Sequence, residues 1–245
     1  MKRIFSSFRS VVGVAGILTA GVIVLSACSK FHGDNNNDNP VAGLMSFNLA
    51  PDQPGIDIEL SGKLLTNQSL GYGSYSGNYQ LIYPGNREVK TTQAGSDSSV
   101  ATQAYTFLPQ QYYSLFVTGA NGNYQNVVTH DNLDSLTATA GKAFVRYINA
   151  IPDSTKPAVT IASGSNNVFN DNASFNHVSD FKAIDAGNVS ITINNGSTIN
   201  NVNRSISLEQ GKVYTVLLGG LPAATDSVKA VQIKYITNGS VDSSK

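Results

Sequence analysis

The chain has 245 residues, with 16 basic and 16 acidic side chains, and charged residues make up only 13% of it, about half the usual share. No cluster of Lys and Arg follows Arg9, which argues against nucleic acid and anionic lipid headgroups as partners, since both reward clustered cations. Cys28 is the only cysteine, so the chain can form no internal disulfide bond.

The first 27 residues have the layout of a secretory signal peptide. Three basic residues, the last of them Arg9, precede an uncharged and mostly apolar run over residues 11–24. This run of 14 residues is shorter than the roughly 20 that a membrane-spanning helix needs, and it fits the roughly 7–15 of a signal peptide. Ser26 and Ala27 supply the small side chains expected before a cleavage site. We therefore assign residues 1–27 to a signal peptide.

Leu25-Ser26-Ala27-Cys28 resembles the lipobox of bacterial lipoproteins. The resemblance implies cleavage before Cys28, diacylation of its sulfur and acylation of the new amino terminus, with fatty acids such as palmitate. Two or more acyl chains hold a protein stably on a membrane, whereas a single chain holds it only marginally. The alternative is an uncleaved anchor helix with a chance cysteine. Because Ser29 and not Asp follows the cysteine, we expect the protein at the outer membrane of the cell envelope.

Residues 28–42 are predicted to form a flexible polar tether. The segment from Ser29 to Pro40 is rich in Asp and Asn and has too little apolar surface to offset the entropy of ordering. Without residues 1–27 the chain keeps 218 residues, of which 13 are basic and 16 are acidic, so its net charge is −3. The tether would hold the folded part of the chain away from the membrane.

From Val41 onwards, apolar residues alternate with polar ones, as they do in half-buried β-strands. The alternation is clean in Ile56–Leu60, Val189–Ile193 and Val231–Tyr235, and turn-forming Gly, Asn and Pro residues separate such runs. Many short strands with regular turns predict an all-β fold of the sandwich or barrel class, and no helix is expected after the signal peptide. The length of the chain fits two sandwiches of about 100 residues each.

The sequence also repeats itself at an offset of about 100 residues, which predicts a tandem pair of domains. The repeat places a boundary near residues 137–141, so we predict β-sandwich domains over residues 43–138 and 139–245. The matched segments, in chain order, are 47–52 with 147–153, 54–58 with 157–161, Tyr79 with Phe181, and 113–116 with 214–217.

Residues 144–153 resemble the opening strand of the bacterial family called domain of unknown function 4397, with an Arg-aromatic-x-Asn stretch followed by Pro-Asp. The resemblance covers most of residues 44–236 and implies immunoglobulin-like β-sandwiches on cell-envelope proteins, with no known activity. Three later features of the family, an aromatic-rich middle, an Ala-Gly turn and a Gly-Lys-x-Tyr-Thr strand, are matched at residues 175–181, 186–187 and 211–215.

The first copy departs from the family pattern at three places. Ser46 replaces the Arg of the family pattern, Leu49 replaces the Asn, and Gln111 replaces the Gly. In the second copy, we expect Arg146 to pair with a carboxylate or a carbonyl at a sheet edge. This structural role is favoured over contact with a ligand.

No pattern of catalytic or metal-ligating residues stands out in the sequence. His32, His130 and His177 are scattered and lie at no metal-ligand spacing from one another, and Cys28 would be acylated, so we expect no metal and no cofactor. No serine lies in a recognisable pattern with an acid and a histidine, although triads can assemble from distant residues. We therefore expect a protein without catalytic activity. The enzyme alternative requires a deep polar pocket with a histidine or paired carboxylates.

Tyrosines gather in the first copy, and exposed tyrosines can stack on sugars or anchor a protein partner. Tyr79 and Tyr113 match aromatic residues of the second copy, so we assign them to the core. Tyr72 and Tyr75 lie in a Gly-Ser loop and are the candidate ligand-binding residues. The lack of Trp weakens a sugar-binding interpretation.

The sequence predicts a membrane-anchored cell-envelope lipoprotein that displays two non-catalytic β-sandwich domains for structural or binding roles. Its expected partners are the membrane, through the lipid on Cys28, and an envelope protein or polysaccharide. The alternative function is that of a glycan-binding accessory lipoprotein, which would use Tyr72 and Tyr75.

Overall fold

The computed structural model describes residues 40–153, 155–222 and 224–241. The predicted signal peptide, Cys28 and most of the predicted tether lie outside the described residues. Within these ranges the only helical element is the single 3-10 turn η1 (Leu133–Ser135), and no helix is long and apolar enough to cross a membrane. The other regular elements are β-strands, which confirms the predicted all-β fold.

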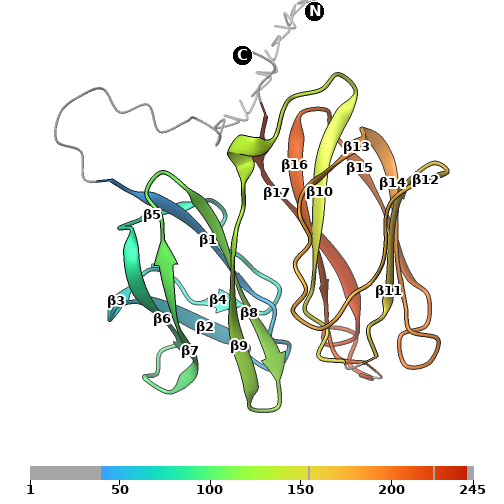
Figure 1. Cartoon of the computed structure of the whole chain (residues 1–245). Coiled ribbons are helices and arrows are strands. Elements are labelled where there is room, and N and C mark those ends of the chain that lie inside the picture. The colour runs from blue at the N-terminus through green and yellow to red at the C-terminus, as the bar shows by residue number, and fades with distance from the viewer. Residues whose placement is uncertain (1–39, 154, 223, 242–245) are drawn as a thin grey trace, which may run out of the picture.

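Domain 1 is a sandwich of two sheets, drawn on the left in Figure 1. Its inner sheet, which faces the other domain, has the strand order β5-β1-β8-β9, and its outer sheet has the order β3-β2-β6-β7, with β4 paired to β2. The strands are β1 (Ala42–Asn48), β2 (Gly55–Leu60), β3 (Lys63–Leu64), β4 (Leu70–Gly71), β5 (Gln80–Ile82), β6 (Gly85–Gln93), β7 (Ser99–Phe107), β8 (Tyr112–Ala120) and β9 (Asn123–His130).

Domain 2 repeats this architecture on the right of Figure 1 and follows the connection that contains η1. Its inner sheet has the order β13-β10-β16-β17, and its outer sheet has the order β12-β11-β14-β15. The strands are β10 (Lys142–Asn149), β11 (Ala158–Ser163), β12 (Asn166–Asn172), β13 (Lys182–Asp185), β14 (Gly187–Asn194), β15 (Val202–Leu208), β16 (Lys212–Gly219) and β17 (Gln232–Ser240).

The two domains share one pairing scheme. In each inner sheet the first strand runs parallel to a late strand, β1 to β8 and β10 to β16, while its pairing on the other side is antiparallel. In the outer sheets, alternate side chains such as Ile56 and Ile58, or Val159 and Ile161, are fully buried between the sheets of their own domain. This period of two is the one read from the sequence, and the predicted tandem pair of β-sandwiches is confirmed.

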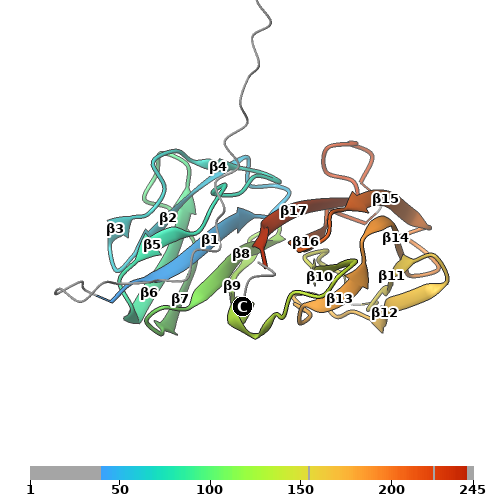
Figure 2. The same ribbon diagram turned by 90° about the horizontal axis from the view of Figure 1, so that it is seen from above.

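The central strands of the inner sheets lack this alternation because both of their faces are covered. Leu44 of β1 points into the core of domain 1, whereas Met45 and Phe47 belong to an apolar cluster shared with domain 2. All seven residues of β1 are buried, and β8, β10 and β16 are buried after their first residue. The view from above shows the two inner sheets between the two outer ones (Figure 2).

Two tyrosine hydroxyls identify equivalent positions in the two domains. The Tyr113 hydroxyl accepts a hydrogen bond from the N–H of Leu108 at 2.9 Å, and the Tyr214 hydroxyl accepts one from the N–H of Glu209 at 3.0 Å. In both cases the donor lies five residues before the tyrosine. The match between these tyrosines that the sequence repeat predicted is therefore confirmed.

The residue equivalent to Arg146 in domain 1 is Met45. Met45 lies opposite Ser114, the residue after Tyr113, and Arg146 lies opposite Thr215, the residue after Tyr214. The assignment of Ser46 to this position is therefore wrong by one residue. The expected place of Arg146 at a sheet edge is also wrong, because β10 lies inside its sheet, between β13 and β16.

The buried asparagine of the family pattern is present in both domains, as Asn48 and Asn149. The Asn48 side-chain oxygen accepts a hydrogen bond from the N–H of Ala50 at 3.1 Å, and that of Asn149 accepts one from the N–H of Ile151 at 3.1 Å. Each side-chain amide also donates to two backbone carbonyl oxygens. The assignment of Leu49 to this position is therefore wrong by one residue.

The family glycine before the late inner strand is replaced by Gln110, not by Gln111. Gln110 has a φ angle of 59°, and Gly211 has a φ angle of 74°. Each lies three residues before its tyrosine, Tyr113 or Tyr214. Because side chains other than glycine rarely adopt this left-handed conformation, the turn before β8 is less favourable than the turn before β16.

Candidate functional site

The domain junction is the surface where the two inner sheets face each other. It contains one apolar cluster to which both domains contribute, and the rings of Phe47 and Phe116 lie 4.7 Å apart at its centre in domain 1. Removing this apolar surface from water stabilises the pair of domains. The buried members are Met45, Phe47, Leu49 and Phe116 of domain 1 and Ile148, Ala150, Leu217 and Ile236 of domain 2.

Arg146 of domain 2 forms a buried ion pair with Asp131 of domain 1, and each residue is only 1% exposed. The guanidinium Nη1 donates to Asp131 Oδ1 at 2.7 Å, Nη2 donates to the Ser114 hydroxyl at 2.8 Å, and Nε donates to the Thr215 hydroxyl at 3.0 Å. The guanidinium carbon also lies 4.4 Å from the ring centroid of Phe181. The cation of one domain is thus enclosed by polar and aromatic groups from both.

Both carboxylate oxygens of Asp131 are occupied. Its second oxygen, Oδ2, accepts hydrogen bonds from the Ser114 hydroxyl at 2.8 Å and the Tyr79 hydroxyl at 2.5 Å. The Tyr79 oxygen accepts from the Asn238 amide at 3.2 Å, and Asn238 Oδ1 accepts from the Thr215 hydroxyl at 2.6 Å. Because Thr215 also binds the guanidinium, the hydrogen bonds close a ring. A buried charge is tolerated when it is paired and hydrogen-bonded in this way.

Tyr79 remains a hydrogen-bond donor in this ring because its proton is held tightly. Burial raises the pKa of Tyr79 well above its usual value of about 10, and the neighbouring Asp131 carboxylate raises it further, while the Arg146 cation opposes the shift. The assignment of Tyr79 to the core agrees with its place in the structure, where its ring packs against the apolar cluster of the domain junction.

Each member of the ion pair has an uncharged counterpart in the other domain. His130 lies opposite Tyr113 and Thr237 lies opposite Tyr214, so the next residues, Asp131 and Asn238, are counterparts. If the two domains had identical residues at these positions, the junction would contain two cations and two anions, whereas it contains one of each. The equivalent pairs around the charges are Met45 and Arg146, Ser114 and Thr215, Asp131 and Asn238, and Tyr79 and Phe181.

A cleft of about 280 Å³ opens beside the ion pair, at the domain junction. Its hydroxyl, amide and carboxylate groups could hydrogen-bond a small polar ligand. His130 lines the cleft, but its Nε2 lies 2.6 Å from Gln111 Oε1 and is engaged there. In the described part of the chain, no group of three or more His, Cys, Asp or Glu residues could hold a metal ion. The lining residues are Thr129, His130, Asp131, Asn132, Ser135, Leu136, Arg146, Ser179, Asp180 and Phe181.

Tyr72 and Tyr75, the candidate binding residues, both lie at the domain junction. The Tyr75 ring stacks on Phe47 with the two ring centroids 5.6 Å apart, and it packs against the shared apolar cluster. Tyr72 lies beneath Lys234 of domain 2, whose ammonium is 5.6 Å from the ring centroid. Burial raises the pKa of Tyr72, and a hydrogen bond with Gln232 opposes the shift. Their role in ligand binding stays a prediction.

Sequence reasoning singled out Arg146 but missed its partners Asp131, Ser114 and Asn238. A signal was present, since the hydroxyl residues Ser114 and Thr215 interrupt the apolar runs of β8 and β16, where they are completely buried. Buried hydroxyls need hydrogen-bond partners, so such positions indicate a polar network. Cys28, the predicted lipidation site, lies outside the described residues and stays a prediction.

Two duplicated β-sandwiches, fused through their inner sheets by a shared core and a buried ion pair, define a tandem all-β domain protein. The chain matches the family described as "Domain of unknown function (DUF4397)" twice, over residues 42–156 and 143–241. It therefore belongs to this family, as the resemblance in the sequence predicted.

None of the curated proteins matches the chain significantly. Among solved structures, an α-glucan-binding streptococcal virulence factor is 10% identical over 78% of this chain and 96% of that chain, with a TM-score of 0.25. A product complex of the multi-modular, glycogen-degrading pneumococcal virulence factor SpuA is 9% identical over 80% of this chain and 22% of that chain, with a TM-score of 0.24. At these TM-scores neither likeness supports an inference about this protein.

Proposed function

We propose that this protein is a lipid-anchored lipoprotein of the cell envelope, at the outer membrane, whose two β-sandwich domains act as one non-catalytic body with a structural or binding role. The observation that carries the proposal is the combination of a short apolar leader with Leu25-Ser26-Ala27-Cys28 at its end. A cysteine placed where lipoproteins receive their lipid, in a chain with no other cysteine, is accounted for by lipidation.

The domain junction supports a role in which the two domains move as a unit. Interfaces between domains that move independently are usually polar and of modest size. Here the central strands β1 and β10 are covered on both faces, and the Arg146–Asp131 pair is sealed from solvent. Opening the junction would expose the apolar cluster and two charges together, so the protein would present a body of fixed shape from its anchor.

A non-catalytic role is consistent with the state of the polar groups beside the cleft. Asp131 accepts three side-chain hydrogen bonds, from Arg146, Ser114 and Tyr79, and is nearly inaccessible. A general base or nucleophile must reach its substrate, and Asp131 is committed to the fold instead. Binding of an envelope protein or polysaccharide remains the proposed alternative to a purely structural role.

The lipid anchor is tested by the Cys28→Ser variant, compared with the unaltered chain and with Ser29→Ala as the matched control. We expect the unaltered chain and Ser29→Ala to fractionate with the outer membrane and to carry the mass of the acyl chains. Cys28→Ser should lack the mass of the acyl chains. The lipoprotein-specific peptidase should no longer cleave its signal peptide, and the lipid should no longer hold the protein in the outer-membrane fraction. Equal mass and equal fractionation of Cys28→Ser and the unaltered chain would refute the proposal.

A further inference from the structure

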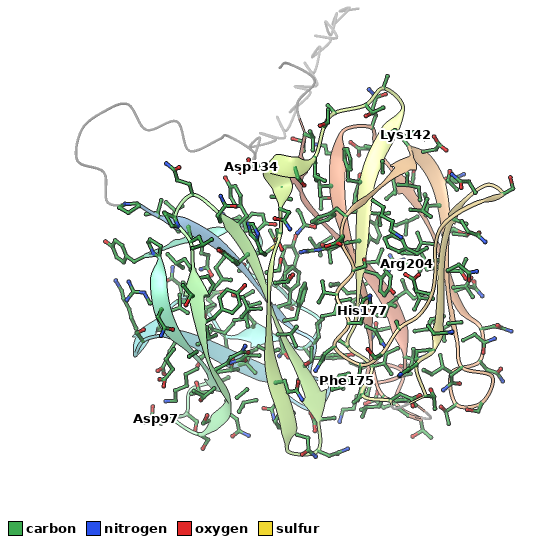
Figure 3. All side chains as sticks on the ribbon, in the orientation of Figure 1. Asp97, Asp134, Lys142, Phe175, His177 and Arg204 are labelled. Atoms are coloured by element: carbon green, nitrogen blue, oxygen red, sulfur yellow. The ribbon has the colours of Figure 1, made fainter. Side chains whose placement is uncertain are left out.

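The chain reaches domain 1 at one end of the sandwich, which we call the proximal tip. It comprises residues 40–41, 83–84 and 108–110. Ala42 pairs with Ile82, so Val41 comes next to Tyr83, and its carbonyl accepts a hydrogen bond from the N–H of Gln110 at 2.7 Å. Gly85 pairs with Phe107, which places the neighbouring Pro84 beside Leu108. The turn that contains Asp97 lies at the opposite end of domain 1 (Figure 3).

Large apolar side chains are exposed at and beside the proximal tip. Tyr83 is 57% exposed, Leu108 is 56% exposed, and Leu81 on the adjoining edge strand β5 is 67% exposed. They are three of the five large hydrophobic residues that are exposed in the described part of the chain. Single exposed apolar residues are ordinary, but a group at one end of a domain indicates a surface that something covers.

The equivalent end of domain 2 is polar, so the fold does not require an apolar tip. Gly85 corresponds to Gly187, since the two residues pair with Phe107 and Leu208 respectively. Two residues before each glycine stand Tyr83 in domain 1 and Asp185 in domain 2, and Leu108 corresponds to Glu209. Two exposed acids thus replace the exposed Tyr and Leu. The two domains therefore share a fold but differ in the chemistry of this end.

The tether joins the folded chain at the proximal tip, which makes the tip the part of domain 1 nearest to the predicted anchor along the chain. Only the eleven residues 29–39 separate Cys28 from Pro40, and a fully extended chain of that length spans at most roughly 40 Å. The strands β6 and β8 have nine residues each, so the far end of domain 1 lies about 30 Å beyond the tip. If Cys28 is in the bilayer, the proximal tip is the part of the folded chain that the tether holds closest to it.

We propose that the proximal tip rests in the headgroup region of the bilayer, with Tyr83 and Leu108 inserted there; this rests on the lipid anchor of the proposed function. Tyr is favoured at membrane–water interfaces because its ring is apolar and its hydroxyl stays hydrated, and Leu adds apolar area. The acyl chains supply the affinity, and the tip sets the orientation. The folded part would then rest on the membrane, in place of the separation by the tether that the sequence alone suggested. The exposed Glu209 carboxylate and the exposed Lys142–Asp185 ion pair keep the end of domain 2 out of the headgroup region, because burying charged groups is unfavourable.

The chain contains no Trp, so a single introduced Trp reports its own surroundings. We would purify the lipidated full-length protein as Leu108→Trp and as Tyr83→Trp, and place each in phosphatidylcholine vesicles with or without brominated acyl chains. The control is Val228→Trp, since Val228 is 64% exposed and lies between β16 and β17, at the opposite end of domain 2. We expect a shift to shorter emission wavelengths and quenching by the brominated lipid for the two tip variants, and neither change for the control.

Flotation of the same vesicles separates this inference from the proposed function. If the unaltered protein floats with the vesicles but both tip variants emit as they do in buffer, the inference is wrong and the lipid anchor stands. If the protein does not float and carries no lipid, both fail. Equal quenching of Val228→Trp would also overturn the inference. A shift of the tip variants without vesicles that grows with protein concentration would mean that a second copy of the chain covers the tip, which again overturns it.

Discussion

The Arg146 guanidinium and the Asp131 carboxylate lie 2.7 Å apart across the domain junction, and the equivalent position of each in the other domain holds an uncharged residue. Met45 is the counterpart of Arg146, and Asn238 is the counterpart of Asp131. One charge therefore comes from each domain, and each satisfies the other. This complementarity makes the two domains specific partners, because neither could bury its own charge alone.

The ion pair predicts opposite results for single and double substitutions. Arg146→Met should lower the free energy of unfolding by about 3–5 kcal/mol, since it leaves the Asp131 carboxylate buried and unpaired. The combined Arg146→Met and Asp131→Asn variant should recover most of this loss, because it removes both charges and recreates residues already present at the equivalent positions. Urea denaturation of the four proteins of the cycle measures the coupling.

An exposed ion pair provides the control for this cycle. Lys142 Nζ lies 2.6 Å from Asp185 Oδ1, yet both side chains are partly in solvent. Lys142→Met should therefore change the free energy of unfolding by no more than about 1 kcal/mol. If Arg146→Met has an equally small effect, the buried pair does not hold the junction together.

The tyrosine hydroxyls predict a loss of stability at alkaline pH. The pKa of Tyr79 is raised in the folded protein, chiefly by burial, and the same cause raises the pKa of Tyr147 and of Tyr214. Above a pH of about 10 the unfolded chain releases these protons while the folded chain retains them, so unfolding becomes more favourable as the pH rises. The contribution of each tyrosine is complete below its unfolded pKa and is lost as the pH rises towards its folded pKa.

Tyr79→Phe isolates the contribution of Tyr79 to this pH dependence. Between pH 10 and pH 11, the free energy of unfolding of the unaltered protein should fall more steeply than that of Tyr79→Phe, by up to about 1.4 kcal/mol per pH unit. Denaturant titrations at several pH values measure the two slopes. Parallel slopes would show that Tyr79 titrates alike in the folded and unfolded states.

Replacing either of the equivalent asparagines, Asn48 or Asn149, should lower the free energy of unfolding by a similar amount. Asn149→Ala removes two donated hydrogen bonds and leaves the N–H of Ile151 without its side-chain acceptor, and Asn48→Ala does the same to Ala50. Each variant should lose about 1–3 kcal/mol of unfolding free energy. Asn203 is exposed and its side chain donates to the Asn201 carbonyl, so Asn203→Ala should change the free energy of unfolding by less than about 0.5 kcal/mol. Losses confined to one domain would mean that the asparagines are not equivalent.

Replacing Tyr75 should lower the stability of the protein. A binding assay on such a variant must therefore separate lost stability from a lost ligand contact. Tyr75→Ala removes the stack on Phe47 and should lower the free energy of unfolding by about 1–3 kcal/mol, whereas Tyr75→Phe keeps the ring and should change it little. Tyr83→Ala, at an exposed site, serves as the control. If Tyr75→Ala is as stable as the unaltered protein, the ring is available to a ligand and the glycan-binding alternative gains support.

The outer sheets could be predicted from the sequence, but the register of the inner sheets could not. Ile56 and Ile58 alternate with polar residues because one face of their strand meets solvent, and this contrast shows which residues point inward. The stretch that contains Met45 and Asn48 has no solvent face, so nothing in its pattern distinguishes one register from the next. The comparison of the two copies consequently slipped by one residue at Met45 and Asn48, and it also slipped by one residue at Gln110, in the turn before β8.

The amino-acid sequence by itself determined the all-β fold, the duplication and the family, because strand period, turn residues and repeated segments are local properties of the chain. Only the tertiary structure decided that Arg146 meets Asp131, and that Tyr72 and Tyr75 lie at the domain junction. These contacts depend on how two complete sandwiches pack, and a buried charge selects its partner by the geometry of that packing and not by its distance along the chain.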